Sequence, residues 1–535
     1  MAAHGADGIE VDSPRGGAAA VPAGSMDAGE SWPIAFGQTL LIAAELHDQT
    51  DAHNELLHER RWLLHPADRS LSLRGNAFAI ENTLDGSGVV MLLLGPLPAA
   101  RATPSDWDLA IRGDAVVLNC DQPYPWATAK YVGGTWGRIA ACRELQRQAR
   151  PYDPAADGLF LTNTWGDRAR DAHLKPAFIL AEIAAAAKLG ADVVQIDDGW
   201  QQGVTANSSA ARKGGGVWDG FWASDPNFWN VHRERFPDGL APLVSAAKGA
   251  GVRLGLWFAP DSSADAANWR RDADAILKLH REHGINFFKI DAMKITSPAS
   301  EENLRRLFSA VRAESGGRVS FDFAITAERR FGYFDLMEHG RLFVENRYTD
   351  WHNYWPHHTL RQAWQLSHWV DPVRLRMEWL NHARNDQHYA DDPLAPSRYR
   401  PDALFATVMF NSPLGWFESQ HLPATYLAQA GPLIATWRLH REAIHRGTIY
   451  PVGNAPDGSA YTGYVSIDPG QRVGYALIFR ELSKANQWSV AVPHLTNGTA
   501  RIEVLGGHGG ATLVDGELHV QIPDPLCFLW LRFSL

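Results

Sequence analysis

The chain shows two successive patterns of apolar and polar positions. Over residues 32–150, short apolar runs are separated at near-regular spacing by turn sequences such as DGSG and RGD, which is typical of an antiparallel β-sandwich. Between about 158 and 420, apolar strands alternate with stretches such as LKPAFILAEIAAAAKLG, whose apolar residues recur at helical spacing. Short strands return after about 430. The pattern predicts an α/β fold: a (β/α)8 TIM barrel flanked by an N-terminal β-sandwich and a small C-terminal antiparallel β-domain.

The positions at which this pattern changes also predict domain boundaries. Residues 1–30, rich in Ala and Gly, are expected to form a disordered tail. The N-terminal β-sandwich is then predicted over 31–155, the catalytic barrel over 156–430 and a C-terminal β-sandwich over 431–535. Eight segments are predicted as the strands of the barrel: 159–165, 192–200, 252–260, 286–293, 318–325, 341–350, 373–379 and 404–410.

Composition and charge narrow the classes of function. The net charge is −10 and no basic block occurs, which argues against nucleic acid and anionic membrane as partners. No apolar run approaches the roughly 18 residues that span a bilayer, and residues 1–30 lack the features of a signal peptide. Three Cys give neither a disulfide framework nor metal-ligand spacing, so a cytoplasmic location is predicted. The 21 Trp suit either the stacking of sugars or a large core.

The sequence VVQIDDGW places Asp197 and Asp198 directly after a run of β-branched residues. Two carboxylates at a strand end cost energy unless polar or cationic groups meet them, so the strand either ends in a solvated turn or faces a ligand. Most of the other predicted strands also end in polar or aromatic residues. These are Trp165, Asp167, Trp257, Lys289, Asp291, Asp322, Glu345, Asn346, Asp350 and Glu378. Because the carboxyl ends of barrel strands form the active-site face, this convergence favours a site.

Two carboxyl groups are candidates for the chemistry. In NFFKIDAMK, Lys289 and Asp291 project from one face of a strand, and the cation would keep the carboxylate charged, as a nucleophile requires; the alternative is a structural pair that plugs the barrel. In ENRYTDW, Asp350 follows a strand among aromatic residues, a setting that suits a general acid; the alternative is the N-cap of the next helix.

A nucleophile and an acid/base on opposite sides of a sugar are what a retaining glycosidase requires, and a barrel can place Asp291 and Asp350 across its mouth. Asp197 and Asp198 would then accept hydrogen bonds from sugar hydroxyls. Three indoles are predicted to stack on apolar sugar faces: Trp200, Trp257 and Trp416.

Together, DDGW on the second strand, Lys-x-Asp on the fourth and N-x-x-T-D about 60 residues later resemble glycoside hydrolase family 36, which holds the retaining α-galactosidases and raffinose-synthase-like relatives. The resemblance covers about 32–535 and implies the three-part fold predicted above. It implies that Asp291 is the nucleophile and Asp350 the acid/base, that Asp197 and Asp198 bind the galactose 4- and 6-hydroxyls, and that Lys289 binds a hydroxyl. The resemblance also matches Trp165 to the N-x-W element of the family's first strand and Trp257 to a W-x-x-P-like turn after its third strand. It further implies a carbohydrate substrate, no cofactor, no metal and a homo-oligomer.

Two departures from the family pattern concern the sugar. The family usually has KWD where this chain has KID, and a Cys-Ser-Gly-Gly-Gly-x-Arg loop where this chain has FDFAITAERRFGYFD. Arg329 or Arg330 would supply the cation of that loop. An altered pocket at the 2-position leaves α-N-acetylgalactosamine, β-L-arabinopyranose and α-glucose open as alternatives to α-galactose.

The sequence therefore predicts an α-galactosidase-like retaining glycosidase that hydrolyses terminal α-linked sugars of oligosaccharides. A transglycosidase of the raffinose-synthase type is the alternative within the class. A non-catalytic sugar-binding barrel and an unrelated metal- or phosphate-dependent barrel rank below it, because both candidate carboxylates are present and no ligand cluster is seen. KGGGVWDGFW, residues 213–222, fails as a phosphate loop; it is either a loop that brings Trp218, Asp219 and Trp222 over the barrel mouth or a plain surface insertion.

Overall fold

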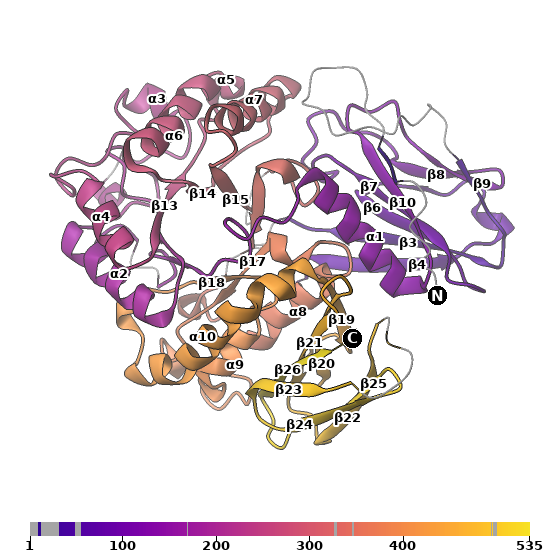
Figure 1. Ribbon diagram of the computed structural model, residues 1–535. Coiled ribbons are helices and arrows are strands. Elements are labelled where there is room, and N and C mark those ends of the chain that lie inside the picture. Colours follow the sequence, from indigo (N-terminus) through magenta and orange to yellow (C-terminus); the bar gives the residue numbers. More distant parts are fainter. Residues whose placement is uncertain are drawn as a thin grey trace.

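A closed barrel of eight parallel strands forms the centre of the computed structural model (Figure 1). The structure describes residues 9–11, 31–48, 55–167, 170–213, 215–325, 329–344, 347–493, 495 and 500–534. The barrel strands are β11 (Leu161–Asn163), β12 (Val193–Ile196), β13 (Arg253–Phe258), β14 (Phe287–Ile290), β15 (Ser320–Ala324), β16 (Gly340–Phe343), β17 (Leu375–Trp379) and β18 (Ser412–Gly415). The predicted fold class is confirmed.

The alternation of side chains along each strand explains how the barrel interior is filled. Leu161, Val193, Phe287, Phe343 and Leu414, from five different strands, form one buried apolar layer inside it. The residues two positions further along β12 and β14 are polar and lie above this layer. The interior is therefore polar above this apolar layer at the carboxyl ends of β12 and β14.

The eighth predicted strand, 404–410, was wrong. That apolar run lies in the buried helix α9 (Pro401–Ala406) and the turn after it, and the strand is the shorter segment β18, with the sequence SPLG. A short apolar run does not distinguish a buried strand from a buried helix, whereas Pro401 at the first helical position is a helix signal.

Helices cover the outside of the barrel. They are α2 (Pro176–Leu189), α3 (Phe221–Ser224), α4 (Ala241–Gly249), α5 (Ser263–Ala266), α6 (Trp269–His283), α7 (Pro298–Glu314), α8 (Pro356–Leu366), α9 and α10 (Ala424–Arg446). None of the helices in the described part of the chain has the length and apolarity to cross a membrane.

Two antiparallel sheets precede the barrel and pack as a sandwich. One has the order β1-β10-β7-β6-β3-β4 and the other β2-β9-β8-β5. Their strands are β1 (Ile9–Val11), β2 (Ser31–Pro33), β3 (Thr39–Leu46), β4 (Leu57–Leu63), β5 (Ser72–Leu73), β6 (Ala77–Asn82), β7 (Gly88–Leu93), β8 (Leu109–Arg112), β9 (Ala115–Leu118) and β10 (Trp126–Tyr131). Helix α1 (Gly134–Ala149) leads from the sandwich to the barrel. Of the tail predicted over 1–30, the structure describes β1, which pairs with β10; the rest lies outside the described residues.

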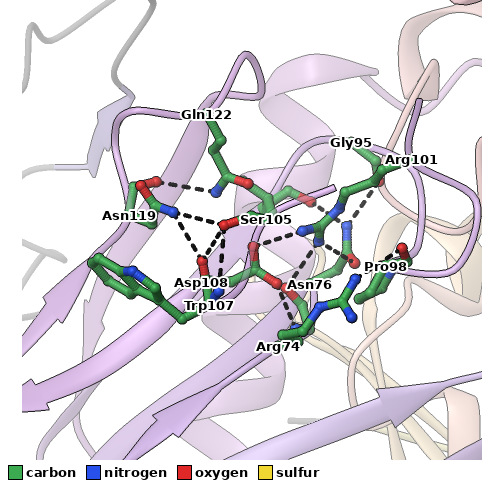
Figure 2. Close-up of polar contacts among 12 residues, drawn as sticks. Arg74, Asn76, Gly95, Pro98, Arg101, Ser105, Trp107, Asp108, Asn119 and Gln122 are labelled. Carbon is green, nitrogen blue, oxygen red and sulfur yellow. Dashed lines mark hydrogen bonds and ion pairs between the residues drawn. The ribbon is translucent and has the colours of Figure 1, made fainter. Parts of the chain in front are cut away.

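A buried polar network fixes the loop that follows β7 in this sandwich (Figure 2). Arg101 and Asp108, both fully buried, form an ion pair at 2.6 Å. The same guanidinium donates to the Asn76 side chain at 3.1 Å and to the carbonyl of Pro96 at 3.0 Å. A buried ion pair is tolerated when its remaining donors and acceptors are also satisfied. Leu97, from the loop held in this way, lies against the barrel segment at Gly332.

Two further sheets follow the barrel, in the orders β19-β20-β21-β26-β23 and β22-β25-β24. Their strands are β19 (Thr448–Gly453), β20 (Tyr461–Asp468), β21 (Val473–Arg480), β22 (Gln487–Ala491), β23 (Ile502–Gly507), β24 (Gly510–Val514), β25 (Glu517–Gln521) and β26 (Cys527–Ser534). An apolar core with Val465, Leu518 and Leu531 joins the two sheets.

Candidate active site

Lys289 and Asp291 stand at the carboxyl end of β14. The Lys289 ammonium lies 3.2 Å from Asp197 Oδ2 and 3.8 Å from Asp291 Oδ2, and the aromatic rings of Phe343 and Trp416 lie within 5.0 Å of it. The ammonium is buried, whereas 21% of the Asp291 side chain is exposed. The pair is therefore not a buried plug, because its carboxylate can be reached from the barrel mouth.

Several groups favour the charged form of Asp291. Burial alone would raise the pKa of this carboxyl, but the charges of Lys289 and Arg330 hold the pKa below its ordinary value. The Arg330 guanidinium lies 3.3 Å from Asp291 Oδ1, and the indole N–H of Trp257 donates to Oδ2 at 3.2 Å. The backbone N–H of Ala292 donates to Oδ1 at 2.8 Å. Asp291 is thus a fixed carboxylate in a cationic setting.

Asp197 and Asp198, at the end of β12, have different environments. Oδ2 of Asp197 accepts hydrogen bonds from Lys289 and from the Asn163 amide, the latter at 2.8 Å. Asp198 is buried under the following loop, where the Thr205 hydroxyl and the Gln201 amide donate to it. Burial raises the pKa of Asp198 to about 7. Asp197 therefore belongs to the charged cluster, and Asp198 is covered by its own loop.

The tryptophans predicted to stack on sugars are placed differently from one another. Trp200 is fully buried and donates its indole N–H to the carbonyl of Trp257 at 2.7 Å, so a stacking role for Trp200 is wrong. Trp257 and Trp416 are also buried and present no open face: the Trp257 indole N–H donates to Asp291, and the Trp416 ring lies 5.0 Å from the Lys289 ammonium. Trp165 is half-buried. Trp218, from the 213–222 loop, is half-buried and stacks on Trp257 with ring centroids 6.3 Å apart.

Asp350 lies in a short 3₁₀ turn, Thr349–Trp351, after β16. It is not the N-cap of α8, because that helix begins at Pro356 with Trp355 as its N-cap. Arg384 lies 3.3 Å from Asp350 Oδ1, the Asn385 amide also donates to this oxygen, and 28% of the side chain is exposed. The preceding residues Glu345 and Asn346, predicted at the same strand end, lie outside the described residues.

Arg384 connects Asp350 to a second acidic group, of which the sequence indicated only Asp167. Among the described residues, Asp167, Glu418 and His421 have ligand atoms within 4.8 Å of one another. Arg384 Nε lies 3.8 Å from Asp167 Oδ1, so a cation already faces these carboxylates. Burial raises the pKa of Asp167 to about 6, and burial followed by the charge of Asp167 raises the pKa of Glu418 to about 8. These groups are the residues that could hold a metal.

Asp48 is a further residue that the sequence did not indicate, because it comes from the N-terminal sandwich. It follows β3, and the neighbouring carbonyl of His47 accepts a hydrogen bond from the Tyr333 hydroxyl at 2.6 Å. Burial raises the pKa of Asp48 to about 7 against the charge of Arg330, which lowers it. The sandwich therefore places an acidic side chain beside the guanidinium that contacts Asp291.

Asp322 was wrongly predicted on the active-site face. It lies in the middle of β15 and is fully paired with Arg341 and Arg376, each at 2.7 Å. Arg376 also donates to the carbonyls of Leu159 and Pro413, which lie at the amino ends of their strands. These groups fill the lower part of the barrel. Glu378 is likewise buried, and it accepts a hydrogen bond from Thr359 of α8 at 3.0 Å.

Comparisons with known proteins agree with this fold. No family model matches the chain. An α-galactosidase of Escherichia coli is 29% identical over 105 residues, and the match spans 19% of this chain and 13% of that relative. A variant of the GH36 α-galactosidase AgaA of Geobacillus stearothermophilus, solved in complex with raffinose, has a TM-score of 0.66 and 14% identity over 94% of this chain and 76% of its own. A β-arabinopyranosidase has a TM-score of 0.54 and 13% identity over 94% and 79% of the two chains. The chain therefore has the fold of GH36 α-galactosidases.

Proposed function

We propose that the chain is a retaining α-glycosidase of the α-galactosidase type, which hydrolyses terminal α-linked sugars of oligosaccharides. One observation carries the proposal. A partly exposed carboxylate, Asp291, ends a barrel strand and is kept charged by Lys289 and Arg330. A second partly exposed carboxyl group, Asp350, follows another strand of the same barrel. A retaining glycosidase needs one carboxylate as nucleophile and another as acid/base.

The reaction would have two steps. Asp291 attacks the anomeric carbon while the bond to the leaving oxygen breaks, and Asp350 gives its proton to that oxygen. Asp350 then takes a proton from water as the water oxygen attacks the anomeric carbon, which releases the sugar and regenerates Asp291. The Arg384 guanidinium, 3.3 Å from Asp350 Oδ1, would hold this carboxyl group in place in both steps. No step needs a cofactor.

The choice of an α-galactoside rests on the fold and on the solved structures. AgaA, whose fold this chain shares, is named as an α-galactosidase and was solved with raffinose. β-L-arabinopyranose is the second candidate sugar, because a β-arabinopyranosidase shares the fold at a lower TM-score. A cytoplasmic location, a homo-oligomer and hydrolysis in preference to transglycosylation stay predictions.

A panel of 4-nitrophenyl glycosides tests the proposal. It contains the α-galactoside, α-N-acetylgalactosaminide, β-L-arabinopyranoside, α-glucoside and α-xyloside. We expect the α-galactoside to be hydrolysed fastest, with the α-anomer of galactose as the first product seen by NMR. A first product of opposite configuration would contradict the retaining mechanism, and no release from any substrate by the folded protein would contradict the function.

Trp351 is expected to bind the leaving-group sugar. It is adjacent to Asp350, its side chain is 50% exposed, and its ring packs edge-on against Tyr348 at 4.6 Å. An exposed indole beside the acid/base can stack on the sugar that leaves. Trp351→Ala should lower kcat/KM for raffinose about tenfold, the equivalent of about 1.4 kcal/mol, and change it little for a 4-nitrophenyl glycoside. Leu439→Ala, at an 82% exposed residue of α10, is the control. Equal losses on both substrates would contradict this role.

A further inference from the structure

A cavity of about 310 Å³ lies outside the barrel, between helix α6 and the segment 222–231. Its lining includes residues from successive turns of α6, namely Arg271, Asp274, Lys278 and Glu282. These positions share one face of the helix and extend over about 17 Å. None of the residues assigned to the active site lines it. The volume is within the range of pockets that hold small organic ligands.

The wall opposite the helix is aromatic. Trp222 and Trp229 line the cavity, and the Arg271 guanidinium lies 4.1 Å from the centre of the Trp222 ring. Trp229 is 4% exposed, and its indole nitrogen is a buried donor that has no hydrogen-bond partner in the described part of the chain. Buried donors are nearly always paired, so an unpaired indole N–H on a residue that lines this cavity is unusual.

The charges around the cavity indicate a neutral ligand. Arg271 and Lys278 alternate along α6 with Asp274 and Glu282, so the two signs balance at the rim. An anion or a cation would meet like charge at every second position. A molecule with hydroxyl groups on its edge and an apolar face, by contrast, meets donors, acceptors and indole surface together. A pyranose ring has this combination.

We propose that this cavity is a second carbohydrate site, which binds a neutral pyranose unit of an oligosaccharide away from the barrel mouth. The choice of sugar as its ligand rests in part on the proposed function. The site is also connected to the active site through packed rings. Trp229 stacks on Phe258 with centroids 4.0 Å apart and lies 5.8 Å from Trp257, whose indole donates to Asp291.

The test counts the sugar molecules that bind to each chain. Asp291→Asn is used as the background so that raffinose is not consumed, and binding is measured by equilibrium dialysis with radiolabelled raffinose. Ala275→Phe fills the cavity from α6 and is expected to abolish one equivalent of bound sugar. Ala241→Phe, at an exposed position of α4, is the matched control and should retain every equivalent. If the Ala275→Phe chain binds as many equivalents as its control, the proposal is overturned.

This experiment distinguishes failure of the cavity proposal from failure of the proposed function. If the barrel mouth binds no sugar, the control binds one equivalent and Ala275→Phe binds none, which supports the cavity and contradicts the function. A second variant guards against misfolding of Ala275→Phe. Lys278→Ala removes a donor from an exposed helix face, and we expect it to weaken the affinity of one equivalent several-fold and leave the other unchanged. Unchanged affinity of both equivalents in this variant also overturns the proposal.

Discussion

Asp291→Asn is expected to lower kcat by about 10⁴-fold or more on the preferred sugar, the equivalent of about 5.5 kcal/mol of barrier. Asn has nearly the same shape but no charge, so it can form no glycosyl-enzyme. The backbone N–H of Ala292, which now donates to Oδ1, can still donate to the amide oxygen, whereas the amide NH2 takes the place of Oδ2, the acceptor of the Trp257 indole N–H. The measurement is kcat with the 4-nitrophenyl glycoside. Asp238→Asn, at an exposed carboxylate before α4, is the control.

A trapping reagent identifies the nucleophile independently. A 2-deoxy-2-fluoro glycosyl fluoride of the preferred sugar should leave a covalent label on the peptide that contains Asp291, detected by mass spectrometry. A label on a different carboxylate, or an Asp291→Asn protein that retains most of its kcat, would contradict the role of Asp291.

The pH dependence of kcat/KM tests whether Lys289 keeps Asp291 ionised. Lys289 is the strongest of the groups that lower the pKa of Asp291, against burial, which raises it. Lys289→Met removes that charge and leaves the burial, so the pKa of Asp291 should rise. The acid limb of kcat/KM, where activity is lost as Asp291 takes up a proton, should therefore move to higher pH. An acid limb that stays in place would show that Lys289 does not set the ionisation of Asp291.

Most of the fold could be predicted from the sequence because barrel strands and helices carry strong local patterns. Seven of the eight strand segments overlap the observed strands, and each is a β-branched or aromatic run between turns. The exception has a physical cause. β18 is four residues long and contains Pro413 and Gly415, both poor strand formers, and its place in the barrel depends on pairing with β11 and β17. Pairing between distant strands leaves no local signal.

The candidate site was predictable only where its residues share a strand end. The alternation of side chains places Lys289 and Asp291 on one side of β14, and the same rule places Asp197 with them. Depth along the strand is harder to infer, so Asp322 was predicted at the mouth although it pairs with arginines lower in the barrel. Groups that reach the mouth from other chain segments, such as Asp48 and Arg384, meet the site only through tertiary packing.

Close packing between strand ends explains why Asp167 was not predicted to lie beside Glu418. Gly166 lies against the backbone of Trp416, where a Cβ would come within 2.0 Å of the carbonyl carbon. This contact between the segments after β11 and β18 lets Asp167 accept a hydrogen bond from the backbone N–H of Glu418 at 3.1 Å. Asp167 and Glu418 are 251 residues apart in the sequence. No pattern within either segment indicates that the two carboxylates meet.

Asp350→Ala is expected to slow both steps of the reaction, because an acid/base residue acts in each of them. Hydrolysis of raffinose, whose leaving oxygen needs a proton, should fall by about 10³-fold, within the range for general acid catalysis. The first step on a 4-nitrophenyl glycoside should fall much less, because nitrophenolate leaves without a proton. The glycosyl-enzyme should then accumulate, since no base activates water, and a burst of nitrophenol should precede a slow steady state.

Azide distinguishes a catalytic role for Asp350 from a structural one. The small anion needs no base, so it should enter the space left by the carboxylate, restore turnover of Asp350→Ala and give the α-glycosyl azide. Arg384 and Asn385, which now hold Asp350, would line this space and favour an anion there. Arg384→Gln should therefore weaken the rescue by azide while it leaves the burst of Asp350→Ala in place. Equal losses on raffinose and on the aryl glycoside, with no azide product, would place the acid/base on another residue.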